Sequence, residues 1–308
     1  MIDRHWQIFS FLGIDTTRLW SGITRDAFAF DDASKRWRTL RKVPGPMGRL
    51  AATAQVVGGR VYLFGGYTVD ARGTEHSLDR VDILDGTHDT WSRGAPIPTS
   101  IDDAVSGVYR DSLIYLVSGW HENDNVQRVQ IYDIARNRWS AGTPVPGPGV
   151  FGHTGAIAGN AIVYIDGVTR NLDLPKYRLA QQSWLGTIDP AHPDRIAWRP
   201  LAPHPGPNRY RAAAASCGSL VIFAGGTDNP YNYNGIGYDG APSPPLSSVI
   251  AFDTRTGAWS LLPSAPTSTM DHRALVIRDD RAVIVGGMRQ DQRVSSDVVQ
   301  WSIGACRS

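Results

Sequence analysis

Cysteine is scarce in this sequence. The 308 residues include only two, Cys217 and Cys306. Two cysteines exclude a cysteine-rich zinc site and a scaffold held together by several disulfides. Because a sequence alone cannot establish that two cysteines pair, the simplest interpretation is two independent thiols.

Long apolar runs and an excess of one charge are missing as well. No stretch approaches the roughly 18 apolar residues that span a bilayer. The 31 Lys and Arg residues are scattered and nearly balanced by 29 Asp and Glu, which leaves a net charge of +2. We therefore expect neither nucleic acid nor a membrane as the main partner. A hydrophobic content of 42% and a charged content of 19% are typical of an ordinary globular protein.

Glycine, proline and tryptophan are abundant, and a pattern organises them. Ten Trp, 32 Gly and 20 Pro favour many short strands joined by tight turns. Apolar runs that end in glycine recur along the chain at 8–13, 60–66, 113–119, 161–167, 220–226 and 282–288. Most are followed by a variable loop, a second strand, a turn and a tryptophan, at Trp37, Trp91, Trp139, Trp198 and Trp259. The mean repeat is roughly 51 residues.

Such a repeat predicts a small antiparallel sheet that must stack on its neighbours to bury its faces. Glycine is expected where a side chain would clash with the adjacent sheet, and the tryptophans are expected in the core between sheets. Six units around an axis predict an all-β, six-bladed β-propeller that forms a single domain. The blades are expected at about 1–44, 45–97, 98–146, 147–202, 203–264 and 265–308.

The glycine pairs, spaced aromatic residues and tryptophans resemble kelch repeats over nearly the whole chain. This resemblance implies the propeller fold. It leaves function open, because kelch propellers include enzymes, adaptors and binding modules.

The blade at the seam between the two chain ends is expected to be incomplete. Only residues 1–7 precede the second strand of the first blade, and only five residues follow the third strand of the last. By the usual strand length, about 20–25 residues are missing, unless residues 1–7 patch the seam. The start shows no signal peptide. We expect a periplasmic or secreted protein if a leader precedes residue 1, and a cytoplasmic one otherwise.

The topology of a blade predicts which residues share a rim. In a four-stranded antiparallel sheet, the start of the first strand and the loop between the second and third strands lie at one end. Ligands of propellers usually bind at this mouth. The first-strand positions supply a charged or imidazole side chain in five blades, from Arg49, Asp102, Asp103, His153, Arg209, Arg211, Asp271, His272 and Arg273, together with Phe151 and Tyr210.

The loops between second and third strands add further candidates. They contribute Trp120, His121 and Lys176, and the long stretch 225–248 in the fifth blade. Taken singly, each charged residue also has a structural interpretation, since Asp caps turns and Arg covers neighbouring side chains. Their convergence favours a polar pocket.

The residue types at this rim suit an acidic or heavily hydroxylated carbohydrate. Arginine and lysine bind carboxylates. His153 and His272 are the predicted general acid and base, with Asp103 and Asp271, because imidazole titrates near neutral pH. Tyrosine and tryptophan faces beside amide-rich loops fit sugar rings and hydroxyls.

The stretch "AGGTDNPYNYNGIGYDG" resembles the corresponding loop of bacterial N-acetylneuraminate epimerases, which are metal-free periplasmic kelch mutarotases of sialic acid. The resemblance implies sugar contacts for Asn232, Tyr233, Asn234, Gly235 and Tyr238. It also implies an isomerase that needs no cofactor and opens and recloses the sugar ring by moving protons. The loop of the fourth blade departs from that pattern.

The chain also resembles the propeller of galactose oxidase, whose copper site uses a tyrosine crosslinked to a cysteine. Cys217 is expected at the opposite rim and Cys306 in the tail, so neither reaches a rim tyrosine. We therefore expect no metal there, although a simple site on His153 and His272 stays open. Two other classes also remain open: a carbohydrate-binding module without catalysis, and a protein-binding propeller. For the stretch 225–248 itself, the alternative to a ligand-binding loop is a rigid cover that plugs the channel.

Overall fold

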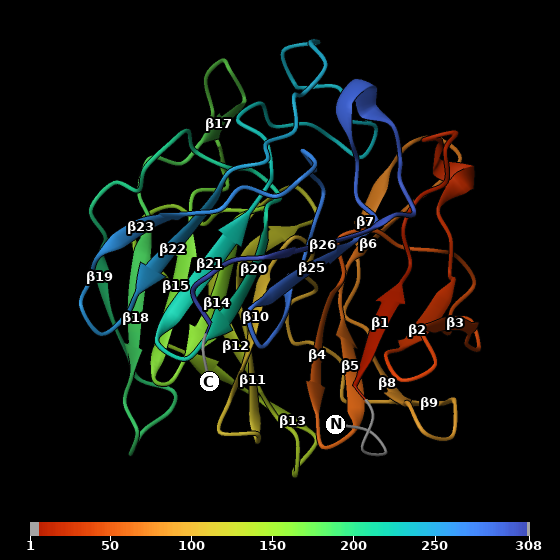
Figure 1. Ribbon diagram of the computed structural model, residues 1–308, viewed down its shortest axis with the longest axis horizontal. Helices are drawn as coiled ribbons and strands as arrows, with labels where there is room; N and C mark the ends of the chain where they lie inside the picture. The colour runs from red at the N-terminus through yellow and green to blue at the C-terminus, as the bar shows by residue number, and fades with distance from the viewer. Residues whose placement is uncertain (1–5, 307–308) are drawn as a thin grey trace.

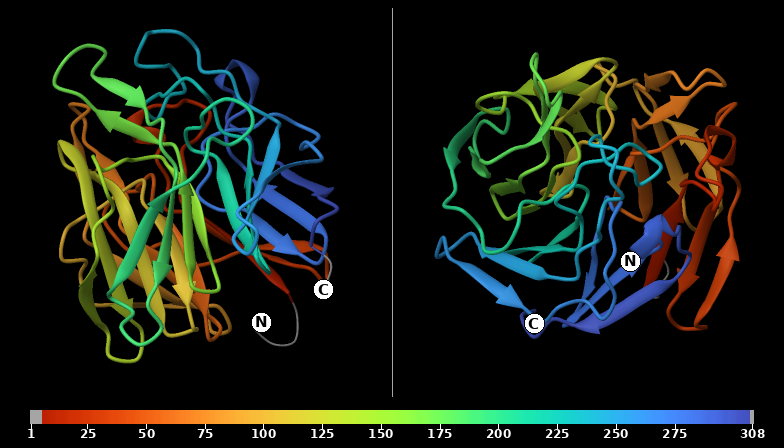
Figure 2. Two further views of the ribbon diagram at one scale, coloured as in Figure 1. Left: turned by 90° about the vertical axis from the view of Figure 1, so that its left-hand side faces the viewer. Right: turned by 90° about the horizontal axis from the view of Figure 1, so that it is seen from above.

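The computed structural model describes residues 6–306. Within this range the regular elements are short strands and two 3₁₀ turns, η1 (Trp20–Gly22) and η2 (Gln290–Gln292). Six antiparallel sheets surround an axis, from the red first blade to the blue sixth blade beside it (Figure 1; Figure 2, right). The predicted all-β, six-bladed propeller is confirmed.

Blades two to five each have four strands, connected in chain order. Blade two contains β4 (Thr53–Val57), β5 (Arg60–Phe64), β8 (Val81–Asp85) and β9 (Thr90–Arg93), and blade three contains β10 (Val105–Tyr109), β11 (Leu113–His121), β12 (Asp124–Asp133) and β13 (Arg138–Gly142). Blade four contains β14 (Thr154–Ala158), β15 (Ala161–Ile165), β18 (Trp184–Ile188) and β19 (Ile196–Pro200). Blade five contains β20 (Ala213–Cys217), β21 (Leu220–Ala224), β22 (Val249–Asp253) and β23 (Trp259–Leu262).

Within the described residues, the two blades at the seam have three strands each, as the sequence predicted. They are β1 (Gln7–Phe11), β2 (Ala27–Asp31) and β3 (Arg36–Thr39) in blade one, and β24 (Val276–Arg278), β25 (Arg281–Val285) and β26 (Val298–Ser302) in blade six. Residues 1–5, part of the segment expected to patch the seam, lie outside the described residues. Arg278 of blade six spans the seam, because its Nη1 lies 2.5 Å from Asp32 Oδ2 and its guanidinium lies over the Trp6 ring.

The hydrophobic core lies between neighbouring blades. One cluster joins Val105 and Tyr115 of blade three to Ile157 and Tyr164 of blade four, all of them buried. The glycines at the ends of second strands permit this close stacking, as expected. A Cβ atom on Gly225 would lie 2.5 Å from the carbonyl oxygen of Thr269 in the next blade.

The repeated tryptophans lie on the outermost strands and are half-buried or exposed. Four of them still pack against the core clusters, as the sequence predicted, namely Trp91, Trp139, Trp198 and Trp259. Trp37, which is 39% exposed, is the exception. The same four donate an indole N–H to a backbone carbonyl near the end of the preceding blade. These bonds are Trp91 to Arg41 (3.0 Å), Trp139 to Ala95 (2.9 Å), Trp198 to Thr143 (3.2 Å) and Trp259 to Ala202 (3.0 Å). Because an indole N–H requires an acceptor, these rings link blades at the periphery.

The cysteines correct the sequence interpretation. Cys217, at the end of β20, and Cys306, beyond β26, form a disulfide, with their Cα atoms 6.0 Å apart. The bond ties blade five to the chain that leaves blade six. Two independent thiols were the wrong interpretation, because residues 89 positions apart become neighbours only once blades five and six stack.

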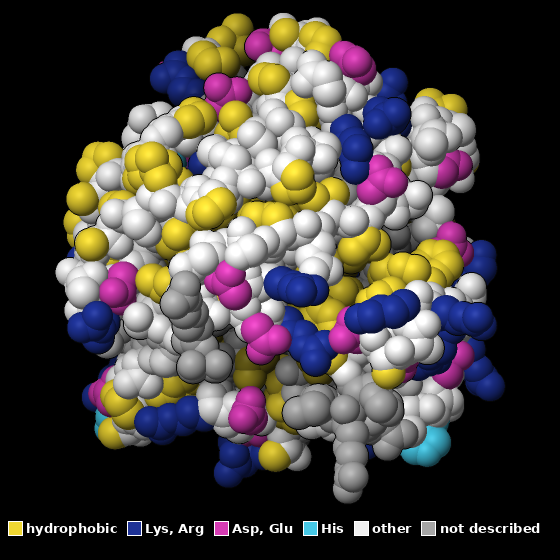
Figure 3. Space-filling view, in the orientation of Figure 1, with side chains coloured by type: hydrophobic (Ala, Val, Ile, Leu, Met, Phe, Trp, Pro, Cys, Tyr) yellow, Lys and Arg dark blue, Asp and Glu magenta, His cyan; other side chains and the backbone are white. Residues whose placement is uncertain are grey.

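Charges are mixed over the surface. On the face drawn in Figure 3, Lys and Arg side chains are interspersed with Asp and Glu. No helix in the described part of the chain is long and apolar enough to cross a membrane.

Candidate functional site

The loops between second and third strands gather at the upper end of the molecule in Figure 1, which we call the mouth. They include the hairpins β6 (Tyr67–Val69) with β7 (Glu75–Ser77), and β16 (Val168–Arg170) with β17 (Tyr177–Leu179). The connections that enter the innermost strands reach the same end, and isolated bridges such as Asp102 to Trp120 and Tyr210 to Thr227 hold the two sets together.

A ring of left-handed residues surrounds the mouth, one in each of blades two to six. They are Ala51, Asp103, Gly152, Arg211 and Asp271, with φ between 50° and 66°. Backbone bonds connect them from blade to blade: Asp103 N–H to Ala51 O (3.1 Å), Gly152 N–H to Asp103 O (3.1 Å), Arg211 N–H to Gly152 O (2.8 Å) and His272 N–H to Arg211 O (3.0 Å). We call these five residues the collar.

Three collar side chains, those of Asp103, Arg211 and Asp271, form a polar cluster with Arg273. Arg211 Nη2 lies 2.7 Å from Asp103 Oδ2, and Arg211 Nη1 lies 3.5 Å from Asp271 Oδ1. Arg273 contacts the same two carboxylates at 2.5 and 3.4 Å. Arg211 and Asp103 are almost inaccessible, whereas the side chains of Arg273 and Asp271 are 20% and 21% exposed.

The carboxyl groups at the mouth differ in proton affinity. Burial raises the pKa of Asp103, but the Arg211 and Arg273 guanidiniums outweigh this and hold it below its ordinary value. Burial and the neighbouring Asp103 charge raise the pKa of Asp102 well above its ordinary value, although Ser77 Oγ donates a hydrogen bond to it at 2.6 Å. Burial also raises the pKa of Glu75. Such a separation is how one site supplies both an acid and a base.

Aromatic rings wall this cluster. The Arg211 guanidinium lies 4.8 Å from the ring centre of Tyr210 and 5.2 Å from that of Tyr231, both of them completely buried. Nearer the surface, Trp120 packs on Phe151 at 5.0 Å between ring centres. Tyr177 and Tyr238 stack at 4.1 Å, and Tyr238 keeps 42% exposure.

The segment 225–248, here called the cap loop, crosses over the axis (Figure 2, right). Its Asn232 carbonyl accepts a bond from Arg211 at 3.3 Å, and its Asn234 carbonyl accepts one from Arg18 of blade one at 2.9 Å. Gln292 of blade six donates to the Ser243 carbonyl at 3.3 Å. The cap loop is thus attached to several blades and covers the buried half of the polar cluster.

Several sequence-predicted residues converge at this place, and several others lie elsewhere. Asp102, Asp103, Tyr210, Arg211, Asp271 and Arg273 come together, with Trp120, Asn232 and Tyr238 around them. Within the cap loop, Asn232 Oδ1 accepts the backbone N–H of Tyr233, and Asn234 Oδ1 accepts that of Ile236. Lys176 is exposed, with its ammonium 5.2 Å from the Tyr177 ring. His121 bonds Ser100 at 2.9 Å beside a separate polar hollow.

Arg49 and Arg209 do not join the cluster. Arg209 donates to the Gly225 and Ser248 carbonyls, each at 2.9 Å, and Arg49 pairs with Asp82 at 2.9 Å. Both lie two residues before a collar residue, and their side chains are buried against the blades. Burial lowers the pKa of each to about 10, so both remain charged at neutral pH.

His153 and His272 lie behind the collar. His153 Nε2 donates to the Val117 carbonyl at 2.8 Å, and the His272 ring packs against Gly287. Burial lowers the pKa of each to about 4. The expectation that these imidazoles titrate near neutrality is therefore wrong, because a buried imidazole resists protonation. Their catalytic role stays a prediction.

Sequence reasoning missed Glu75, Tyr67 and Tyr231. Glu75 hydrogen-bonds the Asn232 side chain. Burial raises the pKa of both Glu75 and Tyr67, and the nearby Arg211 guanidinium offsets only part of this increase. The signal for Glu75 was present, since the loop between the second and third strands of blade two contains it, and the same topological argument places that loop at the mouth.

Comparisons with known proteins address the fold. A kelch motif model matches residues 48–98 and 208–266, which lie in blades two and five. The solved structure of YjhT superposes with a TM-score of 0.78 over 98% of this chain and 93% of that one, at 16% sequence identity. The chain is a six-bladed β-propeller that contains kelch motifs.

The comparisons leave the function of this propeller open. As many as 650 chains of solved structures match it, so the fold is widespread, and a widespread fold does not identify an activity. No curated protein matches the sequence. Among residues 6–306, no group of three or more His, Cys, Asp or Glu could hold a metal ion. Both cysteine sulfurs belong to the disulfide, which leaves no thiol for a tyrosine crosslink.

Proposed function

We propose that this propeller binds an acidic sugar at the mouth and interconverts its anomers, as a mutarotase or epimerase. The observation that carries the proposal is the polar cluster, in which two arginines pair with two carboxylates below aromatic walls, beside Glu75, whose pKa burial raises. Arg273, partly exposed, is the residue best placed to bind a ligand carboxylate. Tyr177 and Tyr238 offer ring faces for the sugar.

The chemistry requires only two proton transfers. A base removes the proton of the anomeric hydroxyl, and an acid protonates the ring oxygen as its bond to the anomeric carbon breaks. The open-chain carbonyl then recloses on its other face by the reverse steps. We assign Asp271, partly exposed and paired with arginine, as the base. We assign Glu75, whose raised pKa favours the protonated form, as the acid. No electrons are transferred, so neither a cofactor nor a metal is required.

The proposal is tested by measuring anomer exchange by NMR for N-acetylneuraminate and galacturonate. We expect Glu75→Gln to lose about a hundredfold in rate with little change in binding, since the amide keeps the shape but cannot donate the acidic proton. Glu122→Gln, at an exposed position on the rim, is the matched control and should retain the full rate. A wild-type protein that accelerates anomer exchange of neither sugar would contradict the proposal.

A second candidate function is binding without catalysis. The cap loop favours it, because it leaves Arg211 and Asp103 almost inaccessible. Calorimetry separates the two candidates. Binding of galacturonate in preference to galactose, lost in Arg273→Gln and unaccompanied by anomer exchange, would identify a carbohydrate-binding module.

We also propose that the protein works in the periplasm or outside the cell. The disulfide between Cys217 and Cys306 supports this, because such bonds persist in oxidising compartments. Fractionation of cells that express the natural protein tests the location, and recovery from the cytoplasm in reduced form would contradict it.

A further inference from the structure

A cavity of about 380 Å³ lies at the rim beside the mouth, and we call it the rim pocket. Its walls are the loop between β1 and β2, the chain that leads into β4, and the β6–β7 hairpin. Its volume falls in the range of about 300–1,000 Å³ that is typical of ligand pockets. The residues that matter below are Trp20, Thr24, Arg25, Lys42, Met47 and Val69.

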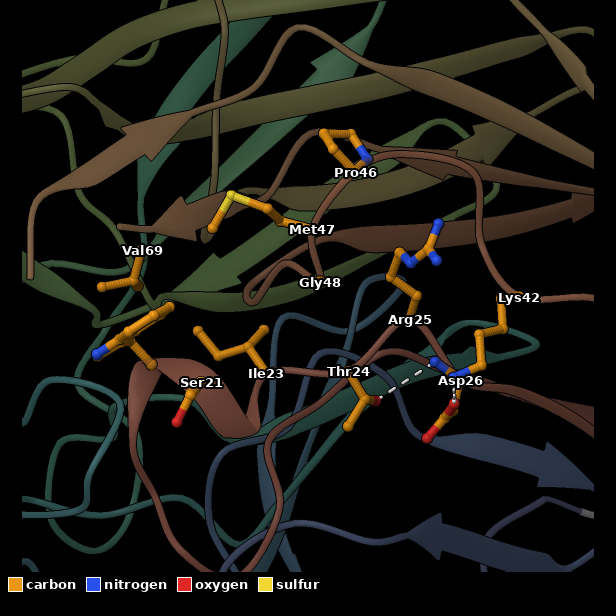
Figure 4. A pocket seen from close by; sticks show the side chains of 11 residues that line it. Ser21, Ile23, Thr24, Arg25, Asp26, Lys42, Pro46, Met47, Gly48 and Val69 are labelled. Atoms are coloured by element: carbon orange, nitrogen blue, oxygen red, sulfur yellow. Dashed lines mark hydrogen bonds and ion pairs between the residues drawn. The ribbon is translucent and has the colours of Figure 1, made fainter. Parts of the chain in front are cut away.

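The rim pocket is apolar at one end and charged at the other. Met47, Val69 and Ile23 lie at the apolar end, and Arg25, Lys42 and Asp26 lie at the charged end (Figure 4). Lys42 pairs with Asp26 at 3.2 Å, yet its side chain stays 64% exposed and is accessible to an anion.

Two large apolar side chains of the rim pocket remain uncovered, since Trp20 is 39% and Met47 41% exposed. The pocket lining thus combines an exposed indole, the Thr24 hydroxyl and two basic side chains, a set that suits a sugar ring with an acidic substituent. The pocket therefore has the same ligand chemistry as the mouth.

Both walls of the rim pocket connect to the mouth. Val69 pairs directly with Glu75 across the β6–β7 hairpin. It also follows buried Tyr67 by two residues, a spacing of about 7 Å along a strand. On the other wall, Arg18 in the same loop as Trp20 donates to the Asn234 carbonyl of the cap loop. Only one cross-strand pair therefore separates the rim pocket from Glu75.

We propose that the rim pocket is a subsite for a second sugar residue, so that the substrate is the reducing end of an acidic disaccharide or oligosaccharide. The reducing-end residue lies in the mouth, and the next residue stacks on Trp20 with its acidic group near Lys42. The inference rests on the proposed function and extends it from a free sugar to a chain.

The test is calorimetric binding of two pairs of probes, N-acetylneuraminate with its 2,8-linked disaccharide and galacturonate with digalacturonate. We expect the wild type to bind at least one disaccharide about tenfold more tightly than its monosaccharide. Trp20→Ala should remove that gain and leave monosaccharide affinity unchanged. Lys42→Gln should weaken disaccharide binding in the same direction. Trp37→Ala is the matched control, because Trp37 belongs to the same blade and has the same 39% exposure, yet does not line the pocket.

The outcomes separate the two proposals. Equal affinity for both members of each pair, with no effect of Trp20→Ala, overturns the subsite and leaves the anomer exchange of monosaccharides untouched. Disaccharide binding that depends on Trp20, without anomer exchange by the wild type, supports the subsite and contradicts catalysis. Failure of the wild type to bind either disaccharide overturns the subsite.

Discussion

Ala51, Asp103, Arg211 and Asp271 hold a left-handed backbone conformation that costs a residue with a side chain about 1–2 kcal/mol. The collar tolerates this cost because its backbone groups bond from blade to blade. Three of the four strained residues supply the polar cluster, which fits the tendency of backbone strain to collect at functional sites. The strain therefore supports the choice of this site independently of its charges.

Gly152 provides a test of the collar, because it is the one glycine among the five. A Cβ atom there would overlap the Tyr210 ring, in addition to the left-handed penalty at φ +60°. We expect Gly152→Ala to lower the free energy of unfolding by about 3 kcal/mol. Ala51→Gly, at the equivalent position of blade two, should change it by less than about 1 kcal/mol. Urea denaturation followed by circular dichroism measures both. Equal losses in the two variants would contradict the role given to the collar.

The burial of the His153 and His272 imidazoles predicts that the protein loses stability in mild acid. Burial lowers the pKa of each from 6.5 to about 4, so between these values the unfolded chain binds a proton that the folded protein excludes. Stability must then fall as the pH falls from 6.5 to 4, by about 2 kcal/mol per histidine at pH 5. Urea denaturation at pH 7 and pH 5 measures the loss. His272→Gln should roughly halve it, and a variant with the wild-type pH dependence would contradict the assignment.

Among the structural elements, the outer strands depend on tryptophan bonds that cross between blades. Trp139→Phe removes the indole donor to the Ala95 carbonyl while keeping an aromatic ring. We expect a loss of about 1 kcal/mol, the net value of one such bond. Trp37→Phe is the comparison, since the more exposed Trp37 packs on Phe30 of its own blade. Thermal unfolding should show a lower Tm for the first variant alone. An equal decrease in the Tm of Trp37→Phe would mean that the smaller ring, and not the lost hydrogen bond, causes the effect.

The second strand of each blade could be predicted from the sequence because a short apolar run that ends in glycine marks it, as in "LVIFAGG" at the start of the cap loop. For the site, the sequence predicted which rim of the propeller carries it, but not which side chains meet there. No sequence signal distinguishes left-handed Arg211, which enters the cluster, from Arg209 two residues earlier, which bonds its own blade. The burial of His153 and His272 was equally invisible, because it depends on neighbouring blades packing over them.

At the scale of the whole molecule, the innermost strands of the described residues form an incomplete ring. The innermost strands of blades two to six contact one another in sequence, from β4 through β10, β14 and β20 to β24, and the collar follows the same arc. Blade one has no equivalent innermost strand among its described residues. The chain beyond β26 is instead attached to blade five by the disulfide, a pairing that depends on the assembled ring and so could not be predicted from two isolated cysteines.

This arrangement predicts that the disulfide stabilises the attachment of blade six to blade five. Closing a loop of 89 residues removes conformational freedom from the unfolded chain, worth about 4–5 kcal/mol by loop entropy and more typically 2–4 kcal/mol in practice. We expect Cys217→Ser, Cys306→Ser and the double variant to lose the same amount, because either change breaks the one bond. A reductant should lower the Tm of the wild type to that of the variants and leave the variants unchanged. Single variants that differ from the double variant would contradict this prediction. A wild type that is insensitive to reductant, while its thiols become accessible to labelling, would show that blade six is held by packing and by contacts such as Arg278 with Asp32.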